Sequence, residues 1–342
     1  MSDRRRFGAF AWAVVGYNLL VVAWGALVRA TGSGAGCGSH WPLCNGEVLP
    51  RTEAVETAIE FGHRVTSAVD GLLVLALVVW ACRAFPRRHP VRAAALLSFV
   101  FLVVEAVIGA GLVRFELVAD DASTARAWVI SAHLVNTFLL FAWLTLTAAW
   151  AERPAADRGW PLALSARDPA AWLLGGALGG VVLLGVSGAV AALGDTLYPV
   201  ASFREGLAQD FSPTAHAFVR LRVWHPLLAL AMVVGVGLVA GWLRRHRPAA
   251  KVRRRSSVLL ALFAAQIAVG LVNLWLAAPV WLQLVHLLMA DLVWIALVLL
   301  AAAALEGSFL EGGCSKPPPP QDAVPWGPLP RDGPLRGPHT RP

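Results

Sequence analysis

The sequence predicts an all-α integral membrane protein with eight transmembrane helices, which form two parallel-repeat four-helix bundles and leave both termini in the cytoplasm. Three features predict this architecture: the composition, a set of eight apolar runs, and residues that recur in the two halves of the chain. Of the 342 residues, 57% are hydrophobic and only 15% are charged. So few polar residues cannot cover a water-soluble globule of this size, and lipid therefore has to be the solvent.

Each apolar run is long enough to cross about 30 Å of hydrocarbon, which takes about 20 residues. The first run is longer than the apolar part of a signal peptide, and no small-residue cleavage site follows it, so we expect it to stay as the first helix. Only Ala277, Ala278 and Pro279 separate the last two runs, and proline cannot continue the preceding helix, which predicts a tight turn. The predicted helices cover about residues 9–28, 64–83, 93–113, 127–149, 171–192, 222–243, 256–277 and 280–304.

The distribution of positive charge predicts the orientation in the membrane. Seventeen of the 29 Lys and Arg residues lie in segments on the side of the N-terminus, eight on the other side and four in the C-terminal tail. Positive residues are retained in the cytoplasm, so we expect a multi-pass membrane protein with both termini on the cytoplasmic side. The arginines form short clusters between apolar runs rather than one stripe, which argues against nucleic-acid binding.

Residues 307–342, with the run Pro317–Pro320, are expected to form a disordered cytoplasmic tail.

The two halves of the chain, residues 1–152 and 168–306, resemble each other. Equivalent residues are separated by 161 to 163 positions in the first three helices and by 153 in the fourth, because the loop after the third helix is longer than the turn after the seventh. Since each half has an even number of spans, the halves are predicted to be parallel repeats. The matched residues are Gly25 with Gly188, Ala26 with Ala189, His63 with His225, Glu105 with Gln266, Gly109 with Gly270, and His133 with His286.

Four histidines lie close to the outer ends of their predicted helices and form two pairs, His63 with His133 and His225 with His286. Histidine inside a membrane span marks a function or a hydrogen bond to a neighbouring helix, and its recurrence in both halves favours a function. Two imidazoles on facing helices suit the two axial positions of haem iron. Zinc usually takes a third or fourth protein ligand, and no Cys, Asp or Glu recurs beside both pairs. The sequence therefore predicts that all four histidines bind haem iron near the outer face.

Charged residues near the histidines distinguish the two sites. Glu60 precedes His63 by three residues, and the matching position in the second half is Arg222. A carboxylate near one haem and an arginine near the other predict different roles, although Glu60 could instead only cap its helix. Arginines at this depth can bind the haem propionates or reach lipid headgroups. The candidates for propionate binding are Arg29, Arg64, Arg220 and Arg222.

Cys37 and Cys44 lie in the first outer loop, on the oxidising side of the membrane. Disulfides form in such compartments, and one that closes so short a loop contributes at most about 2 to 3 kcal/mol. This position favours a structural or redox disulfide over metal binding. Cys82 and Cys314 lie on the reducing side and are expected to have no role.

These residues together resemble the haem A synthase family, in the bacterial type with a cysteine pair in the first outer loop. The resemblance covers about residues 10–305. The chain departs from the family at Glu105, because Gln, as at Gln266, is the residue type expected there. The motifs that carry the resemblance are GALVRATGSG at 25–34, the Cys37–Cys44 loop with WPLC and Gly46, EFGHR at 60–64, His133 with Leu134, RLRVWHP at 220–226, and His286.

The resemblance implies an oxidoreductase that converts the C8 methyl group of haem O into the formyl group of haem A by successive hydroxylations. It implies that His63 and His133 form the substrate site, that His225 and His286 ligate a permanent haem b, and that Glu60 lies nearest the chemistry. The resemblance implies as partners haem O, membrane lipid, an electron donor and the haem O synthase, which is a farnesyltransferase, and it implies a location in the bacterial inner membrane. It leaves open whether the chain forms a homo-oligomer.

Two other functions compete with this one. A two-haem electron carrier or quinol oxidoreductase would use similar histidine pairs, but such carriers usually stack their haems from one side of the membrane to the other. A parallel-repeat transporter with structural histidines should show matched glycine or proline breaks within its helices, and these are weak here.

Overall fold

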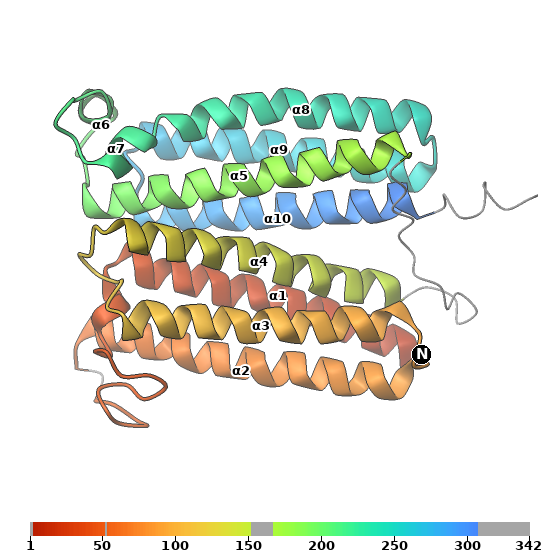
Figure 1. The fold of residues 1–342 in the computed structure, drawn as a ribbon, viewed down its shortest axis with the longest axis horizontal. Coiled ribbons are helices and arrows are strands. Elements are labelled where there is room, and N and C mark those ends of the chain that lie inside the picture. The colour runs from red at the N-terminus through yellow and green to blue at the C-terminus, as the bar shows by residue number, and fades with distance from the viewer. Residues whose placement is uncertain (1–2, 52, 152–166, 307–342) are drawn as a thin grey trace, which may run out of the picture. The chain divides into compact units, whose positions relative to one another are not determined.

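The computed structural model describes residues 3–51, 53–151 and 167–306, and most of these residues are helical. Apart from helices, turns and bends, they contain a single isolated β-bridge between Cys44 and Glu47. The C-terminal segment 307–342, expected to be a disordered tail, lies outside the described residues. The all-α prediction is therefore confirmed for the part of the chain that the structure describes (Figure 1).

Within the described residues, eight helices are long and apolar enough to cross a membrane, as predicted. In the sixth span, a short helix, α7, leads directly into α8. The membrane-length helices are α1 (Asp3–Ala30), α2 (Val55–Ala84), α3 (Pro90–Arg114), α4 (Thr124–Ala151), α5 (Pro169–Leu197), α8 (Trp224–His246), α9 (Ala250–Trp275) and α10 (Val280–Leu305); the short ones are η1 (Ser33–Ala35), α6 (Phe203–Asp210) and α7 (Ala217–Leu221).

Helix α2 begins at Val55, well before the predicted residue 64, so His63 lies inside the helix and not at its start. Hydropathy missed these first turns because they carry polar residues. The first loop satisfies those residues: the Thr57 hydroxyl donates to the Gly36 carbonyl oxygen (2.7 Å), and Glu60 accepts from the Cys37 N–H. Polar residues in a helix are stable where neighbouring segments bond them, and apolarity alone does not report this.

The turn between α9 and α10 agrees with the sequence prediction. Ala277 and Ala278 both adopt positive φ angles, 57° and 54°, and Pro279 then caps α10. The short helices α6 and α7 were not predicted. Each begins with a side chain that caps it, Ser202 bonding the Glu205 N–H and His216 bonding the Phe218 N–H.

The eight membrane-length helices pack as two groups of four (Figure 1). In the first group α1 contacts α2 and α4, and α3 contacts α2 and α4; in the second α5 contacts α8 and α10, and α9 contacts α8 and α10. The groups meet mainly where α4 packs on α5 and α10, and where α1 packs on α10. The rings of Phe138 and Trp294 stack across this boundary, 4.7 Å apart, and the Trp294 indole N–H donates to the Phe138 carbonyl oxygen (2.6 Å).

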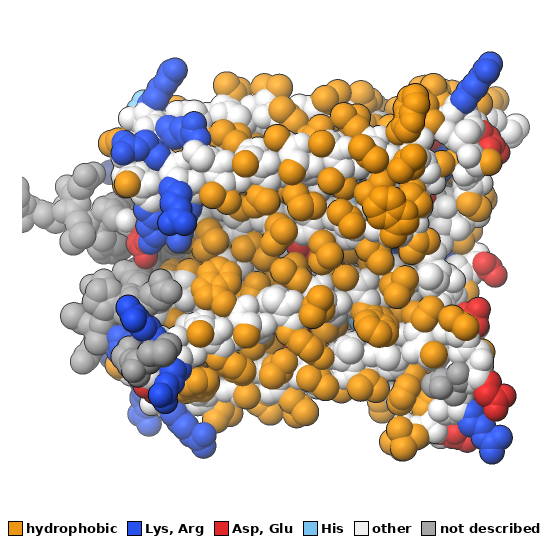
Figure 2. All heavy atoms as spheres, turned by 180° about the vertical axis from the view of Figure 1, so that it is seen from behind, with side chains coloured by type: hydrophobic (Ala, Val, Ile, Leu, Met, Phe, Trp, Pro, Cys, Tyr) orange, Lys and Arg blue, Asp and Glu red, His pale blue; other side chains and the backbone are white. Residues whose placement is uncertain are grey.

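Hydrophobic side chains cover most of the face shown in Figure 2. Lys and Arg gather mainly at one end of the helices in this view, whereas most of the visible Asp and Glu lie at the other end. This distribution is typical of helices that cross a bilayer.

Replacing Trp294 with Ala should destabilise the protein by about 3 kcal/mol, because the substitution removes a buried ring and leaves a cavity between the two helix groups. The measurement is the unfolding temperature of the purified protein in detergent. Trp281→Ala is the matched control on the same helix, since Trp281 is 60% exposed and Trp294 only 4%. Equal unfolding temperatures for the two variants would contradict this prediction.

Candidate functional site

The four predicted histidines lie at one end of the helix assembly, on α2, α4, α8 and α10. His63, His133, His225 and His286 are all partly buried. Each lies nearer the N-terminal end of its helix, and these four ends lie opposite the α2–α3 and α8–α9 connections. The structure therefore brings to one end the side chains that the sequence matched in pairs.

Each histidine ring lies against a glycine of the long helix that precedes it in its own half. A Cβ atom at Gly188 would approach His225 Cε1 to 2.9 Å, and one at Gly270 would approach His286 Cε1 to 2.9 Å. In the first half, a Cβ at Gly25 would lie 3.0 Å from His63 Cε1, and one at Gly109 would lie 3.6 Å from His133 Nε2. The matched glycines thus leave room for the imidazoles between closely packed helices.

The two histidines of the second half face each other. Their ring centroids are 6.2 Å apart and their planes are nearly perpendicular, at 87°. The Ser187 hydroxyl contacts His225 Nδ1 (3.0 Å), and the Gln266 amide nitrogen contacts His286 Nε2 (3.3 Å). Two imidazoles that face each other across an apolar bundle fit the axial positions of one haem iron.

The histidines of the first half have a different environment. His133 Nδ1 lies 2.6 Å from Glu105 Oε1, and the same carboxylate accepts hydrogen bonds from Thr137 (2.5 Å) and Asn136. His63 Nδ1 is buried and has no hydrogen-bond partner among the described residues. Within the described residues there is no group of three or more His, Cys, Asp or Glu side chains placed to hold a metal ion.

Glu60 connects helix α2 to the first loop. Its Oε2 accepts from the Cys37 N–H (2.7 Å), and its Oε1 accepts from Arg64 Nη2 (2.5 Å). Arg64 also donates to the carbonyl oxygens of His40 (2.7 Å) and Leu43 (2.6 Å). Cys37 and Cys44 form the predicted disulfide, with Cα atoms 4.4 Å apart. The buried carboxylate is therefore held three residues from His63, on the same face of α2.

Arg222, which the sequence matched with Glu60, bonds the end of α5 and α6 at the histidine end of the second half. Its guanidinium donates to Asp195 (2.8 Å), Asp210 (2.8 Å) and Gln209 (2.7 Å). Arg220 is exposed and makes no hydrogen bond or ion pair to another described residue that the structure records. Matching positions of opposite charge thus bond neighbouring segments in each half: Glu60 of α2 bonds the first loop, and Arg222, just before α8, bonds α5 and α6.

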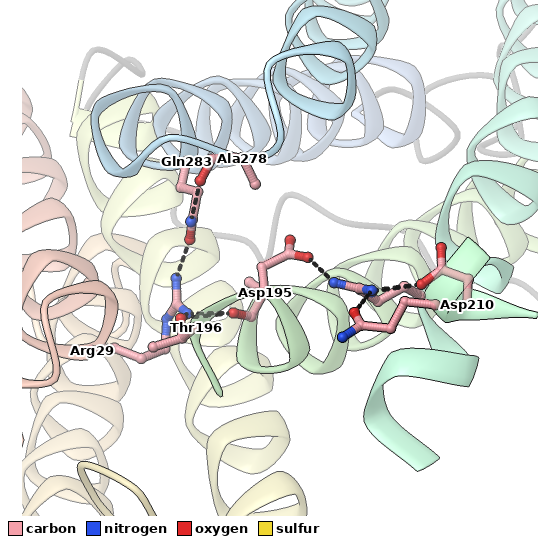
Figure 3. A network of polar contacts seen from close by, with 9 residues as sticks. Arg29, Asp195, Thr196, Asp210, Ala278 and Gln283 are labelled. Atoms are coloured by element: carbon pink, nitrogen blue, oxygen red, sulfur yellow. Dashed lines mark hydrogen bonds and ion pairs between the residues drawn. The ribbon is translucent and has the colours of Figure 1, made fainter. Parts of the chain in front are cut away.

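Arg29 connects the two halves, which the sequence did not indicate. Its guanidinium donates to the Ala192 carbonyl oxygen (2.8 Å), to Thr196 (2.7 Å) and to the Gln283 side chain (3.1 Å). Figure 3 shows Arg29 reaching from α1 towards α5 and α10.

The sequence analysis also missed the contact between Glu105 and His133. The mismatch of Glu105 with Gln266 was a signal that this helix differs in the two halves.

Gly36→Ala should detach the first loop from α2, because the new Cβ would lie 2.5 Å from the Glu56 carbonyl group. Such an overlap costs about 1 to 3 kcal/mol. We expect the disulfide Cys37–Cys44 to be reduced faster, which thiol labelling after mild reductant measures. Gly16→Ala is the control, because no atom lies within 4 Å of a Cβ there. If both variants are reduced at the same rate, the loop does not depend on this close contact.

The chain matches the COX15-CtaA family of cytochrome oxidase assembly proteins over residues 8–298. It is 50% identical over 303 residues to a protein of Thermus thermophilus named protoheme IX farnesyltransferase, which is 88% of this chain and 49% of that protein. It is 41% identical over 128 residues to the haem A synthase of an Exiguobacterium species, covering 36% of this chain and 42% of that enzyme.

The haem A synthase of Halalkalibacterium halodurans is 37% identical over 137 residues, which is 40% of this chain and 45% of that enzyme. The chain thus matches less than half of the length of each of these curated relatives. Because the family match extends over nearly all of the described helices, this chain belongs to the COX15-CtaA family of cytochrome oxidase assembly proteins.

Proposed function

We propose that this protein is a haem A synthase, a membrane oxidoreductase that oxidises the C8 methyl group of haem O to a formyl group. One observation carries the proposal: two pairs of histidines lie at one end of two four-helix groups, each ring against a glycine, in a member of a cytochrome oxidase assembly family. The relatives named haem A synthase support it. The product, haem A, would serve terminal oxidases.

The two histidine pairs are proposed to hold different haems. His63 and His133 would bind the substrate haem O, and His225 with His286 would bind a resident haem b. This assignment is supported by the facing rings of His225 and His286 and by the glycines that lie behind all four rings. The resident haem would supply electron transfer when it is bound. The division into residues 1–152 and 168–306 follows from this assignment.

The haem propionates are proposed to meet guanidinium groups at the histidine end. Arg64 would serve the first site and Arg220 the second, since both stand within five residues of a histidine. Arg29 and Arg222 are further candidates: each has five N–H donors, and the protein partners do not use all of them.

Glu60 is proposed as the catalytic residue of the first site. It is buried, its carboxylate is held in place by Arg64 and the Cys37 N–H, and the second half has an arginine at the matching position. A carboxylate in this position can accept a proton or stabilise a developing positive charge at the reacting carbon. Arg64 and the Cys37 N–H then serve to orient it.

The proposed partner in the same pathway is the farnesyltransferase that makes haem O. The relative at 50% identity carries that enzyme's name and is about twice as long as its match to this chain, which supports close association of the two activities. The proposed location is the bacterial inner membrane, with the histidine end outside. The basic residues at the opposite end support this orientation.

The proposal is tested by producing the full chain in cells that make haem O but lack haem A synthase. We expect extracted haem to contain the hydroxymethyl and formyl products. His225→Ala should abolish the conversion because the resident haem loses a ligand, whereas His246→Ala, an exposed histidine at the other end of the same helix, should not. If the protein carries only unmodified haem b after incubation with haem O and reductant, it is an electron carrier and the proposal is wrong.

Glu60→Gln keeps the size of the side chain but removes its charge, so we expect it to lower the conversion rate by a factor of about 10² or more. The measurement is the rate of formyl product per haem-loaded protein. Glu56→Gln, one turn earlier and exposed, is the control and should retain the wild-type rate. A Glu60→Gln protein with full haem content and a rate within twofold of wild type would show that Glu60 only anchors the loop.

A further inference from the structure

The Nδ1 atoms of the four histidines have three different environments. Those of His63 and His286 are buried and have no hydrogen-bond partner among the described residues. His225 Nδ1 contacts the neutral hydroxyl of Ser187, whereas His133 Nδ1 lies 2.6 Å from the Glu105 carboxylate. Of these four rings, only that of His133 is paired with a charged group.

The Glu105 carboxylate is held in place from two directions. The Thr137 hydroxyl donates to the same oxygen that His133 contacts, and the Asn136 side chain donates to the other oxygen. All three partners of this α3 side chain come from one stretch of α4, His133 to Thr137. This arrangement orients the carboxylate along the Nδ1 edge of the ring and leaves His133 Nε2 pointing away from it, towards Gly109.

The second half lacks this arrangement. The matching residue is Gln266, whose amide nitrogen lies 3.3 Å from His286 Nε2, not Nδ1. A neutral amide on the other ring nitrogen cannot play the same part as a carboxylate on Nδ1. The position therefore differs in both charge and geometry between halves that otherwise share their glycines and histidines.

We infer that Glu105 is a positioning residue that strengthens His133 as an axial ligand and so lowers the midpoint potential of the haem in the first half. This inference rests on the proposed haem site. A carboxylate that accepts the Nδ1–H of a ligating histidine fixes the tautomer and the ring orientation and raises the basicity of the other nitrogen. A more basic ligand donates more electron density to iron and stabilises its oxidised form, and such hydrogen bonding is one of the means by which proteins tune haem.

The chemical consequence is an asymmetry between two sites with the same ligands. The first half would hold its haem with one carboxylate-bound imidazole, whereas the described hydrogen-bond partners of the second pair are the neutral side chains of Ser187 and Gln266. Oxidation of an unactivated methyl group requires a strongly oxidised centre, and a strong donor ligand favours reaching it. The carboxylate is in the half to which the proposed chemistry is assigned.

The test is a spectroelectrochemical titration of the purified, haem-loaded full chain and its Glu105→Gln variant. We expect one of the two midpoint potentials to shift upward in the variant and the other to stay unchanged. The second variant is Thr137→Val, which removes a donor to Glu105 but keeps the carboxylate. Since the carboxylate then becomes a stronger acceptor for His133, the same potential should shift downward.

Opposite shifts in the two variants distinguish ligand tuning from a general disturbance of the bundle, which would move the potential in the same direction in both. Two bound haems with no shift in Glu105→Gln would overturn the inference while leaving the proposed function intact. If the Glu105→Gln variant loses its haem, the Thr137→Val variant provides the test. An unchanged or raised midpoint potential in the Thr137→Val variant overturns the inference. A wild-type chain that binds no haem would instead overturn the proposed function.

Discussion

The close approach of helices at matched glycines is the constraint on which the rest of this protein depends. Without a hydrophobic driving force between helices inside a bilayer, association relies on packing, and small residues let two backbones come near enough to pack well. Here Gly188 and Gly270 leave so little space that even one added carbon would meet a histidine ring. The same feature that packs the helices therefore sets the depth and direction of the imidazoles, so that structure and ligand geometry cannot vary separately.

The two halves share this framework and differ in their charges. Glu60 and Arg222 occupy matching positions, and each bonds a neighbouring segment: Glu60 accepts from the Cys37 N–H of the first loop, and Arg222 donates to Asp195 of α5 and Asp210 of α6. Glu105 and Gln266 differ in a similar way beside the second histidine of each pair. A duplicated scaffold can take two roles once single polar residues change the environment of equivalent ligands, because the helices that carry them need not move.

The halves are also connected at the histidine end and deeper in the bundle. Arg29 of α1 bonds Thr196 of α5 and Gln283 of α10, close to the histidine helices of the second half. Deeper, the stacked pair Phe138 and Trp294 joins α4 to α10, the helices that carry His133 and His286. Each of these two helices bears a proposed iron ligand, so their direct packing keeps the two sites at a defined separation. This supports a protein in which both sites work together.

The sequence alone predicted the all-α class, the eight spans and the turn at Ala277 to Pro279, because lipid imposes length, apolarity and internal hydrogen bonding on every span. Matching the two halves indicated which histidines would lie at the same end of the helices. The sequence also indicated the cysteine pair that forms the disulfide. Only the tertiary structure showed that α2 begins at Val55, that Arg29 bonds the other half and that Glu105 reaches His133. These features depend on polar contacts between residues far apart in the chain, and neither hydropathy nor repeat matching reports which side chains will meet.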